Sequence, residues 1–328
     1  MSLWYRLVDR DRRLLALLAE HKVLTTRQVA AIEFTSIRRA QDRLRRLYEL
    51  GVLFTFRQSY ANGGTSETRF ALGYVGKRLI CALRAKTPPA PKVYAESLER
   101  LVVWPKLEHH LGVNDFFCDL AAHRNPARHS KYGVSGGTLT QWWPEKRCVE
   151  FFWSSSGHEV RLRPDGYGCW EHHGRAVRFF LEHDTGTESL TVVTRKIADY
   201  SAFPTDRFGI LLFSVHSTKR EIALRAALSR AQAGYDPGFV IATAARDHGH
   251  VDGPAGPVWA IWDPRDSTAP VRRYRLEELP ERGPRVNHRA IGPDEPLSEA
   301  AFDPNDRQMM DLIYKATDPR RANDSWGD

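Results

Sequence analysis

Two short apolar runs separated by turn-forming residues place the strongest constraint on the fold of the second half of this chain. The runs are Val160–Leu162 and Ala176–Leu181, and both have the length and composition of strand segments. Between them, Glu171–Gly174 provides the polar and glycine residues that reverse the direction of a chain. The pattern therefore predicts a β-hairpin.

Both predicted strands end in acidic residues. Asp165 follows the first run, and Glu182 and Asp184 follow the second. Because alternate residues of a strand point to one face, Glu182 and Asp184 project together, and strand pairing brings Asp165 beside them. Three converging carboxylates make an oxygen-ligand site for Mg²⁺ or Mn²⁺, as in a metal-dependent phosphodiesterase. The alternative is that they are solvated acids that close two strands.

Positive charge is concentrated in the first quarter of the chain. Residues 1–86 hold 17 Lys/Arg and 7 Asp/Glu residues, a net charge of +10, whereas the remaining residues hold 31 and 33. Such asymmetry is typical of a module that binds a polyanion, and it predicts double-stranded DNA as the partner. The alternative is a solvated basic surface.

Three helices are predicted within this basic module. Leucines at helical spacing predict the first over Asp9–Lys22, and a Thr25–Gln28 capping box starts a short second helix that ends near Ile32. The third spans Ser36–Leu50, where apolar residues recur every three or four positions and Gly51 ends the helix.

A hairpin is predicted after the third helix. The strand-like segments Val52–Arg57 and Thr68–Leu72 flank a turn at Asn62–Gly64. Three helices followed by a hairpin predict a winged helix-turn-helix, in which the third helix enters the DNA major groove. The alternative is a winged helix used for protein contact.

Arginines on the third helix are the predicted DNA contacts. Arg38, Arg39 and Arg43 are the best candidates for the major groove, where arginine binds guanine O6 and N7 or holds phosphate. Further candidates are the neighbouring arginines on the helix and those flanking the wing: Arg45, Arg46, Arg57 and Arg69.

The chain length of 328 residues fits two domains and a tail. No apolar run reaches the roughly 20 residues that a membrane helix needs, and no secretory signal is evident at the start. Four scattered cysteines without a CxxC pair predict reduced thiols in a cytoplasmic protein. The expected organisation is a DNA-binding domain at 1–86, a Pro-rich linker at 87–96, an α/β domain at 97–245 and a Pro/Gly-rich, partly disordered extension at 246–328.

The second domain is predicted to have an α-β-β-β-α-β order with further α and β elements. A helical stretch at 97–123, broken near Pro105, places His110 and Asn114 on one face as secondary site candidates. The other predicted segments are strands at 138–143, 148–153, 160–163, 176–181, 209–215, 239–243 and 258–262 and helices at 188–203, 219–231 and 297–316. This order implies an α+β fold with a mixed sheet flanked by helices.

The order of elements resembles the core of restriction-endonuclease-like nucleases, the PD-(D/E)XK superfamily. Pro164-Asp165 matches the first motif element, and Glu182-His183-Asp184 lies where (D/E)-x-K is expected. Asp184 stands in place of the motif lysine, which in this superfamily positions the attacking water and stabilises developing charge. Some members supply the cation from the following helix, and the resemblance then assigns that role to Lys196 or Arg195.

The chain as a whole resembles the replication-relaxation family of actinobacterial plasmids and integrative elements. The residues that carry this resemblance are 11–15, 24–28, 44–53, 110–116, 163–167 and 179–188. The resemblance implies a role in plasmid replication or DNA relaxation. Relaxase chemistry through a tyrosine is disfavoured, because the one His-x-His sequence, His248–His250, lies in a Gly/Pro-rich loop.

Three functions remain open at this stage. The first is a DNA-binding protein that nicks or cleaves DNA with Mg²⁺ or Mn²⁺ through Asp165, Glu182, Asp184 and Lys196. The second is a non-enzymatic replication or transcription regulator whose nuclease-like domain serves dimerisation or DNA contact. The third is a winged-helix regulator whose second domain binds a small ligand. The sequence does not decide whether the protein forms a homodimer.

Overall fold

The computed structural model describes residues 6–60, 62–127, 136–154, 163–201, 209–231, 237–263 and 271–281. The expected helix at 297–316 and the core of the expected strand at 160–163 lie outside these ranges. The described chain mixes helices with a six-stranded mixed sheet, which confirms the predicted α+β class. It forms two compact units, the first up to Leu111 (unit 1) and the second from Gly112 onward (unit 2).

Unit 1 begins with the three predicted helices, α1 (Asp9–His21), α2 (Thr26–Glu33) and α3 (Ile37–Glu49). The capping box that starts α2 is confirmed. The backbone N–H of Gln28 donates to Thr25 Oγ1, and the backbone N–H of Thr25 donates to the side-chain Oε1 of Gln28. The apolar side chains of these helices form the core of unit 1. They include Leu14, Leu15, Leu18, Val29, Ile32, Ala40, Leu44 and Leu47.

The predicted hairpin follows α3 as β2 (Leu53–Phe56) and β3 (Arg69–Leu72), which pair antiparallel. Gly51 ends α3 with a φ of 66°, the left-handed conformation that a C′ glycine adopts at little cost. A short strand, β1 (Leu24–Thr25), pairs with the other edge of β3, and this third strand was not expected from the sequence.

Three further helices follow, α4 (Tyr74–Leu83), α5 (Pro91–Val102) and α6 (Leu107–Ala121). The break near Pro105 is confirmed, since α5 and α6 are separate helices. The expected linker at 87–96 overlaps the first half of α5. The reason is that Pro91 occupies the first turn of the helix, where its fixed φ favours helix and its missing N–H leaves no bond unmade.

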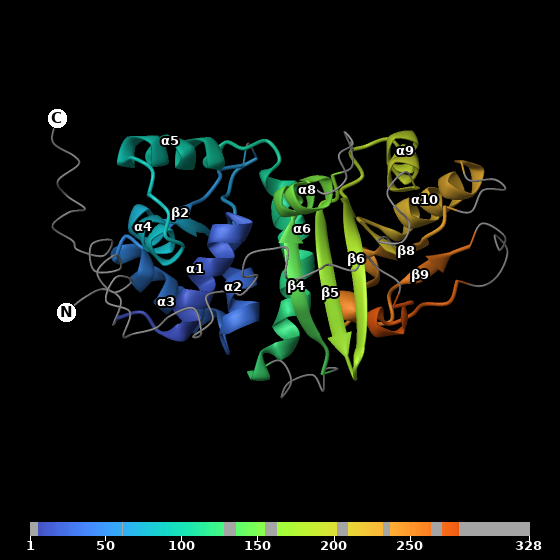
Figure 1. The fold of residues 1–328 in the computed structure, drawn as a ribbon, viewed down its shortest axis with the longest axis horizontal. Coiled ribbons are helices and arrows are strands. Elements are labelled where there is room, and N and C mark those ends of the chain that lie inside the picture. Colours follow the sequence, from blue (N-terminus) through green and yellow to red (C-terminus); the bar gives the residue numbers. More distant parts are fainter. Residues whose placement is uncertain are drawn as a thin grey trace. The chain divides into compact units, whose positions relative to one another are not determined.

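Unit 2 is built on a six-stranded sheet in the order β4-β5-β6-β7-β8-β9 (Figure 1). The antiparallel strands β4, β5 and β6 come first, β7 and β8 run parallel to β6, and β9 returns antiparallel on β8. The strands span Thr138–Pro144, Gly166–His172, Arg175–Asp184, Ile210–Val215, Val240–Ala245 and Ala260–Trp262.

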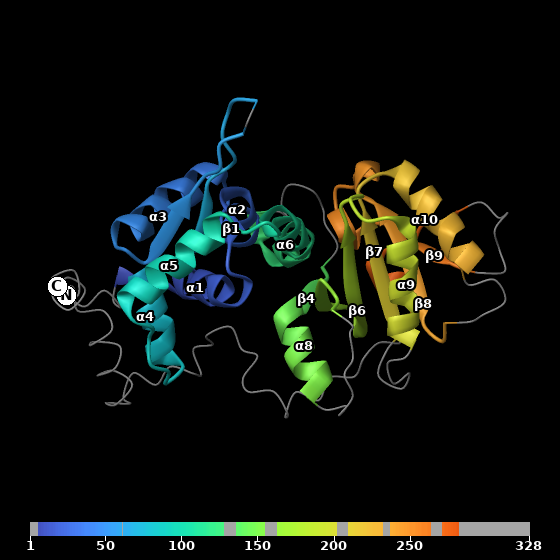
Figure 2. The same ribbon diagram turned by 90° about the horizontal axis from the view of Figure 1, so that it is seen from above.

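Helices cover both faces of this sheet. Figure 2 shows α6 on one face and α9 (Leu190–Ser201) with α10 (Thr218–Ala231) on the other. The alternation of side chains along β6 fits these layers, because Phe179 and Leu181 join the core under α6 while Phe180 joins the core under α9 and α10. Glu182, two residues after Phe180, therefore faces α9.

The hairpin of unit 2 differs from the expected one in its first strand. β5 begins after Asp165, at Gly166, and pairs with β6 from His172↔Arg175 to Gly166↔Leu181. The turn is His173-Gly174, where both residues have positive φ, as the tight hairpin turn demands. Two glycines concealed this strand from the sequence pattern. A Cβ on Gly166 would lie 2.6 Å from the Phe117 ring and one on Gly168 2.5 Å from the Phe179 ring, so aromatic packing requires glycine.

The expected strand at 148–153 is also wrong, because this segment belongs to helix α8 (Glu145–Ser154). Pro144 ends β4 and cannot donate a further ladder hydrogen bond. Beyond it, Lys146 Nζ lies 3.6 Å from Glu150 Oε1, an i,i+4 pair that only a helix brings together.

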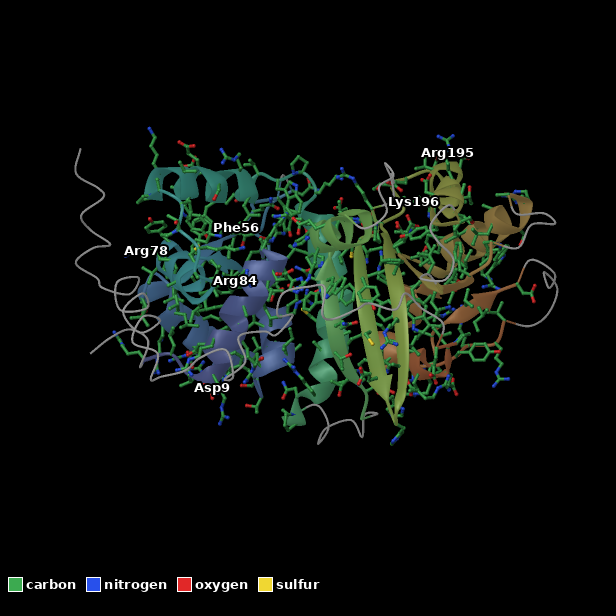
Figure 3. All side chains as sticks on the ribbon, in the orientation of Figure 1. Asp9, Phe56, Arg78, Arg84, Arg195 and Lys196 are labelled. Carbon is green, nitrogen blue, oxygen red and sulfur yellow. The ribbon has the colours of Figure 1, made fainter. Side chains whose placement is uncertain are left out.

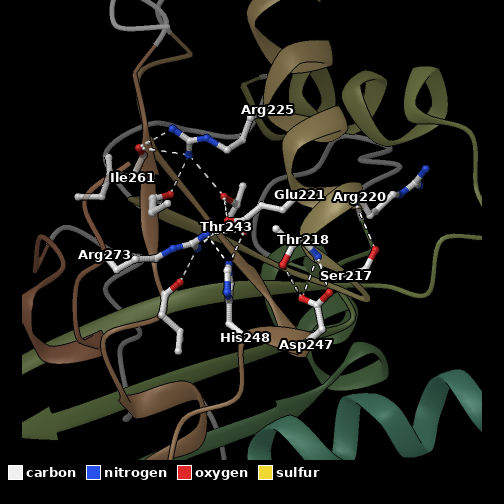
Figure 4. Close-up of polar contacts among 12 residues, drawn as sticks. Ser217, Thr218, Arg220, Glu221, Arg225, Thr243, Asp247, His248, Ile261 and Arg273 are labelled. Carbon is white, nitrogen blue, oxygen red and sulfur yellow. Dashed lines mark hydrogen bonds and ion pairs between the residues drawn. The ribbon is translucent and has the colours of Figure 1, made fainter. Parts of the chain in front are cut away.

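A buried carboxylate on α10 ties the last described segment to the sheet (Figure 4). Glu221 is 2% exposed, and both of its oxygens accept hydrogen bonds from Arg273, at 2.8 and 2.7 Å. Thr243 Oγ1 on β8 donates to the same carboxylate at 2.6 Å. Burial favours the neutral acid, but the bonds from Arg273 and Thr243 outweigh it and lower the pKa of Glu221.

We predict that Glu221→Gln destabilises unit 2 by about 2–3 kcal/mol, below the range for a fully buried pair because Arg273 keeps some exposure. The stabilisation from Glu221 should also fade as the pH falls through its lowered folded pKa. Denaturant unfolding of the variant against pH measures both effects. The control is Glu150→Gln in the exposed Lys146 pair, with an expected change under about 1 kcal/mol. Equal losses in the two variants would contradict the assignment.

Candidate functional site

Asp165 and Glu182 lie near each other where β5 begins beside the end of β6. Asp165 immediately precedes β5, whose last pair with β6 is Gly166↔Leu181, and Asp165 N donates to Leu181 O at 3.0 Å. The Asp165 carboxylate is fixed in turn, because Oδ2 accepts a hydrogen bond of 2.7 Å from the amide nitrogen of His183. The charge of Asp165 acts on Glu182, Lys196 and Tyr200, so the Asp165 carboxylate lies beside the partners of Glu182 on α9.

Helix α9 supplies two hydrogen-bond partners of Glu182. Lys196 Nζ lies 2.7 Å from Glu182 Oε2, and the Tyr200 hydroxyl donates to Glu182 Oε1 at 2.7 Å. Lys196 and Tyr200 are one helical turn apart, so one face of α9 presents a cation and a hydroxyl to the same carboxylate. Lys196 Nζ also lies 3.4 Å from the exposed Glu188.

The electrostatics of the pair follow from burial and from the second acid. Burial of Glu182, which is 3% exposed, and the charge of Asp165 raise its pKa from 4.5 to about 7, against the bonds from Lys196 and Tyr200. The pKa of Lys196 is also raised, because the charges of Glu182 and Asp165 outweigh its own desolvation. The two shifts oppose each other, since an ionised Glu182 suits Lys196 but not Asp165. Because burial and the charge of Asp165 outweigh the bonds to Glu182, this glutamate gives up its proton less readily than a surface glutamate.

Asp184 has a separate set of partners. It is 8% exposed, and its carboxylate accepts hydrogen bonds from Arg220 on α10 at 2.6 and 3.1 Å and from Gly186 N at 3.0 Å. Burial opposes ionisation, but these bonds outweigh it and lower the pKa of Asp184. Asp184 is therefore paired with Arg220, whereas the sequence predicted that it would form a cluster with Asp165 and Glu182. Among the described residues no three Asp, Glu, His or Cys side chains are arranged to hold a metal ion.

The two cations considered for the site differ in direction. Lys196 is partly buried and contacts Glu182, whereas Arg195 is exposed and points outward from α9 in Figure 3. Lys196 is thus the residue that the helix brings to the acids. The sequence signal for Tyr200 was present, because it lies four residues after Lys196 on a helix whose buried face includes Val193 and Ile197. Arg220 had no comparable signal.

Four of the predicted DNA-contact arginines lie on the exposed surface of α3: Arg38, Arg39, Arg45 and Arg46. Arg39 Nη1 bonds the Thr35 hydroxyl at 3.1 Å, and Arg45 Nε lies 3.9 Å from Glu49 Oε1. Both contacts are exposed and weak, so they leave the guanidinium groups available to a ligand.

The other three predicted arginines are engaged within unit 1. Arg43 binds the buried Asp11 through two hydrogen bonds, and Arg69 is 3% exposed and bonds Gln58 and Glu108 at 2.6 and 2.5 Å. The expectation that Arg69 lies on the surface beside the wing is therefore wrong. Arg57 is exposed and donates to Thr68 Oγ1 at 2.7 Å, which joins the two strands of the hairpin.

The secondary candidates His110 and Asn114 lie on opposite sides of the division between the units. His110 Nε2 lies 2.7 Å from the carbonyl oxygen of His21, and its ring packs on Trp104 with centroids 5.1 Å apart. Asn114 is 1% exposed within unit 2.

Comparison with known families identifies the class of protein. The family model described as replication-relaxation matches residues 15–208, which is more than half of the chain. The chain belongs to the replication-relaxation family, as the resemblance of its motifs predicted, and this membership points to a role in replication or relaxation. No curated protein and no solved structure matches the chain. Within the described residues, no helix is both long and apolar enough to cross a membrane.

The raised pKa of Glu182 predicts a pH-dependent stability. A carboxyl group with a folded pKa of about 7 stabilises the fold fully below its unfolded pKa near 4.5, and this contribution is lost as the pH rises through 7. We expect Glu182→Gln to remove that loss, so that the variant gains stability relative to the native chain between pH 5 and 8. Thermal unfolding across this range measures it, with Glu188→Gln as the control. If the stability of Glu182→Gln and that of the native chain changed with pH in parallel, the raised pKa of Glu182 would be contradicted.

Proposed function

We propose that this protein binds duplex DNA through unit 1 and cuts or nicks it at the Asp165–Glu182–Lys196 site of unit 2. The observation that carries the cleavage proposal is the meeting of two neighbouring carboxylates, Asp165 and Glu182, with a lysine ammonium 2.7 Å from the second. Two acids and one lysine are what the PD-(D/E)XK motif provides. The lysine comes here from α9, because Asp184 occupies its usual position and pairs with Arg220.

The residues fit a divalent cation of the kind that such nucleases use. Mg²⁺ is commonly held by one or two carboxylates together with substrate phosphates, so Asp165 and Glu182 suffice as protein ligands. The raised pKa of Glu182 reflects its burial and the charge of the partly exposed Asp165, which the bond from Lys196 does not fully offset. When bound, Mg²⁺ or Mn²⁺ would supply Lewis-acid stabilisation of charge on the phosphoryl oxygens.

The chain's own residues have distinct roles in this proposal. Asp165 and Glu182 hold the cation, and the Tyr200 hydroxyl fixes the Glu182 carboxylate in one orientation. Lys196 Nζ carries the positive charge that stabilises the negative charge that develops on the phosphate. Asp184 has a supporting role, because its bonds to Arg220 and Gly186 fix the chain just after the site.

The DNA-binding part of the proposal rests on unit 1. Its order of three helices followed by a hairpin is that of a winged helix-turn-helix, and α3 carries four exposed arginines. In the winged helix-turn-helix, this helix is the one that enters the major groove. The local net charge of +10 in residues 1–86 supports a polyanion as the partner.

A second candidate function is a non-enzymatic replication or transcription regulator. The observation that favours it is that both oxygens of Glu182 are already bonded, one to Lys196 and the other to Tyr200. In this function the acid–lysine–tyrosine set would hold β6 against α9, and DNA contact would fall to unit 1. The two functions differ in whether DNA strands are cut.

We predict that purified protein nicks or linearises supercoiled plasmid with Mg²⁺ or Mn²⁺ but not with EDTA. Asp165→Asn should abolish cleavage, because it removes a ligand charge, while gel-shift binding to the same DNA is retained. Glu281→Gln, which alters an exposed acid of unit 2 paired with Arg175 beside the hairpin turn, is the matched control and should cut normally. Binding without cleavage by the native chain on its own target DNA would favour the regulator instead.

The double substitution Arg38→Ala and Arg39→Ala should weaken duplex binding, because it removes two cations from the exposed face of α3. The dependence of log affinity on log salt should become shallower by about 1–2. The matched control removes two exposed cations elsewhere in unit 1, Arg84→Ala with Lys86→Ala; Arg84 is labelled in Figure 3. Affinity that falls equally in both double variants would show a general charge effect and count against α3.

A further inference from the structure

The outward side of α3 is defined by the residues that it buries. Ala40, Leu44 and Leu47 face the core of unit 1, and successive residues of a helix turn by about 100°. The residues diametrically opposite are therefore at positions 38, 42, 45 and 49, and all four are exposed. They are Arg38, Asp42, Arg45 and Glu49.

Asp42 is the unexpected member of this row. In the described part of the chain no hydrogen bond or ion pair involves its carboxylate, although Arg38 and Arg45 are one turn away on either side. Arg45 pairs with Glu49 at 3.9 Å instead. A carboxylate in the centre of a basic helix face lies where DNA phosphates would repel it, and the repulsion weakens binding to every sequence.

One contact in the major groove would make this carboxylate favourable for binding. The exocyclic N4 amino group of cytosine is a hydrogen-bond donor there, and Asp or Glu is the side chain that accepts from it. Arg38, four residues earlier on the same face, is suited to guanine O6 and N7. A carboxylate flanked by arginines on an exposed recognition helix therefore suits direct contact with C·G base pairs better than contact with the phosphate backbone alone.

We propose that Asp42 makes DNA binding by this protein sequence-specific by accepting a hydrogen bond from a cytosine amino group in the major groove. This inference rests on the proposed DNA-binding function of unit 1, and it adds the class of substrate, which is duplex DNA with cytosine at one fixed position. Asp42 rejects other bases by repulsion, because guanine and thymine offer its charge only acceptor groups or a methyl group, and adenine places its N7 acceptor beside its amino donor.

The test begins with selection of preferred duplexes from a random pool by the full chain. Dissociation constants are then measured on the preferred duplex and on duplexes in which each cytosine is replaced in turn. We expect one replacement to weaken binding by about 5- to 150-fold, the discrimination of a well-formed base contact. In Asp42→Ala this preference should disappear while affinity for unrelated duplex rises, a gain that loss of folding cannot produce.

Two further variants make the result specific to the base contact. Asp42→Asn should shift the preferred base at that position toward adenine, the base that an asparagine side chain recognises. Glu49→Gln removes an equal charge from the same face near the end of the helix, and it should raise affinity for all duplexes evenly with the cytosine preference kept.

The outcomes separate the inference from the proposed function. If the native chain binds duplex DNA with no base preference, or if Asp42→Ala and Glu49→Gln raise affinity for every duplex alike, the role of Asp42 is overturned and DNA binding stands. If the native chain binds no duplex at all at low salt, the proposed DNA-binding function itself is overturned.

Discussion

The contact on which the candidate site depends is the antiparallel pairing of β5 with β6, because it brings Asp165 to Glu182 from 17 positions away in the sequence. Gly166 and Gly168 make this pairing compatible with the core, since any side chain there would collide with Phe117 or Phe179. The arrangement of the acids is therefore set by aromatic packing on the other face of the sheet. A change in that packing would move the acids without touching them.

The sequence predicted those parts of the fold whose signals are local. Helices α1, α2 and α3 follow from apolar spacing, the Thr25–Gln28 capping box and Gly51, each within a few residues of its effect. Lys196 was named through the resemblance to PD-(D/E)XK nucleases, as a cation on the predicted helix that follows the acids. The sequence failed where a long-range contact overrides a local signal. β5 contains glycines that look like turn residues until the rings that fill their space are known.

The candidate site was predicted in part, for a related reason. The alternation rule correctly put Glu182 and Asp184 on one face of β6, but it is silent on which partner each acid meets. Arg220 lies 36 residues beyond Asp184, and its pairing with that acid depends on where α10 crosses the strand ends. A face of a strand is a local property, whereas a carboxylate's partner is a property of the packed molecule. The same limit applies to Arg69, a buried residue whose partners Gln58 and Glu108 lie 11 and 39 positions away in the sequence.

The charge of the Glu182 site separates the two candidate functions physically. With both acids ionised, Asp165, Glu182 and Lys196 leave one net negative charge, and a phosphodiester brings one more. A DNA backbone therefore cannot settle there on the strength of Lys196 alone, so cleavage needs a divalent cation to reverse the sign of the site. Without such a cation, and with Glu182 ionised, these residues repel DNA, which leaves duplex contact to the basic surface of unit 1. A neighbouring acid pair that one lysine leaves negatively charged suits a metal-dependent nuclease, which is why we rank cleavage first.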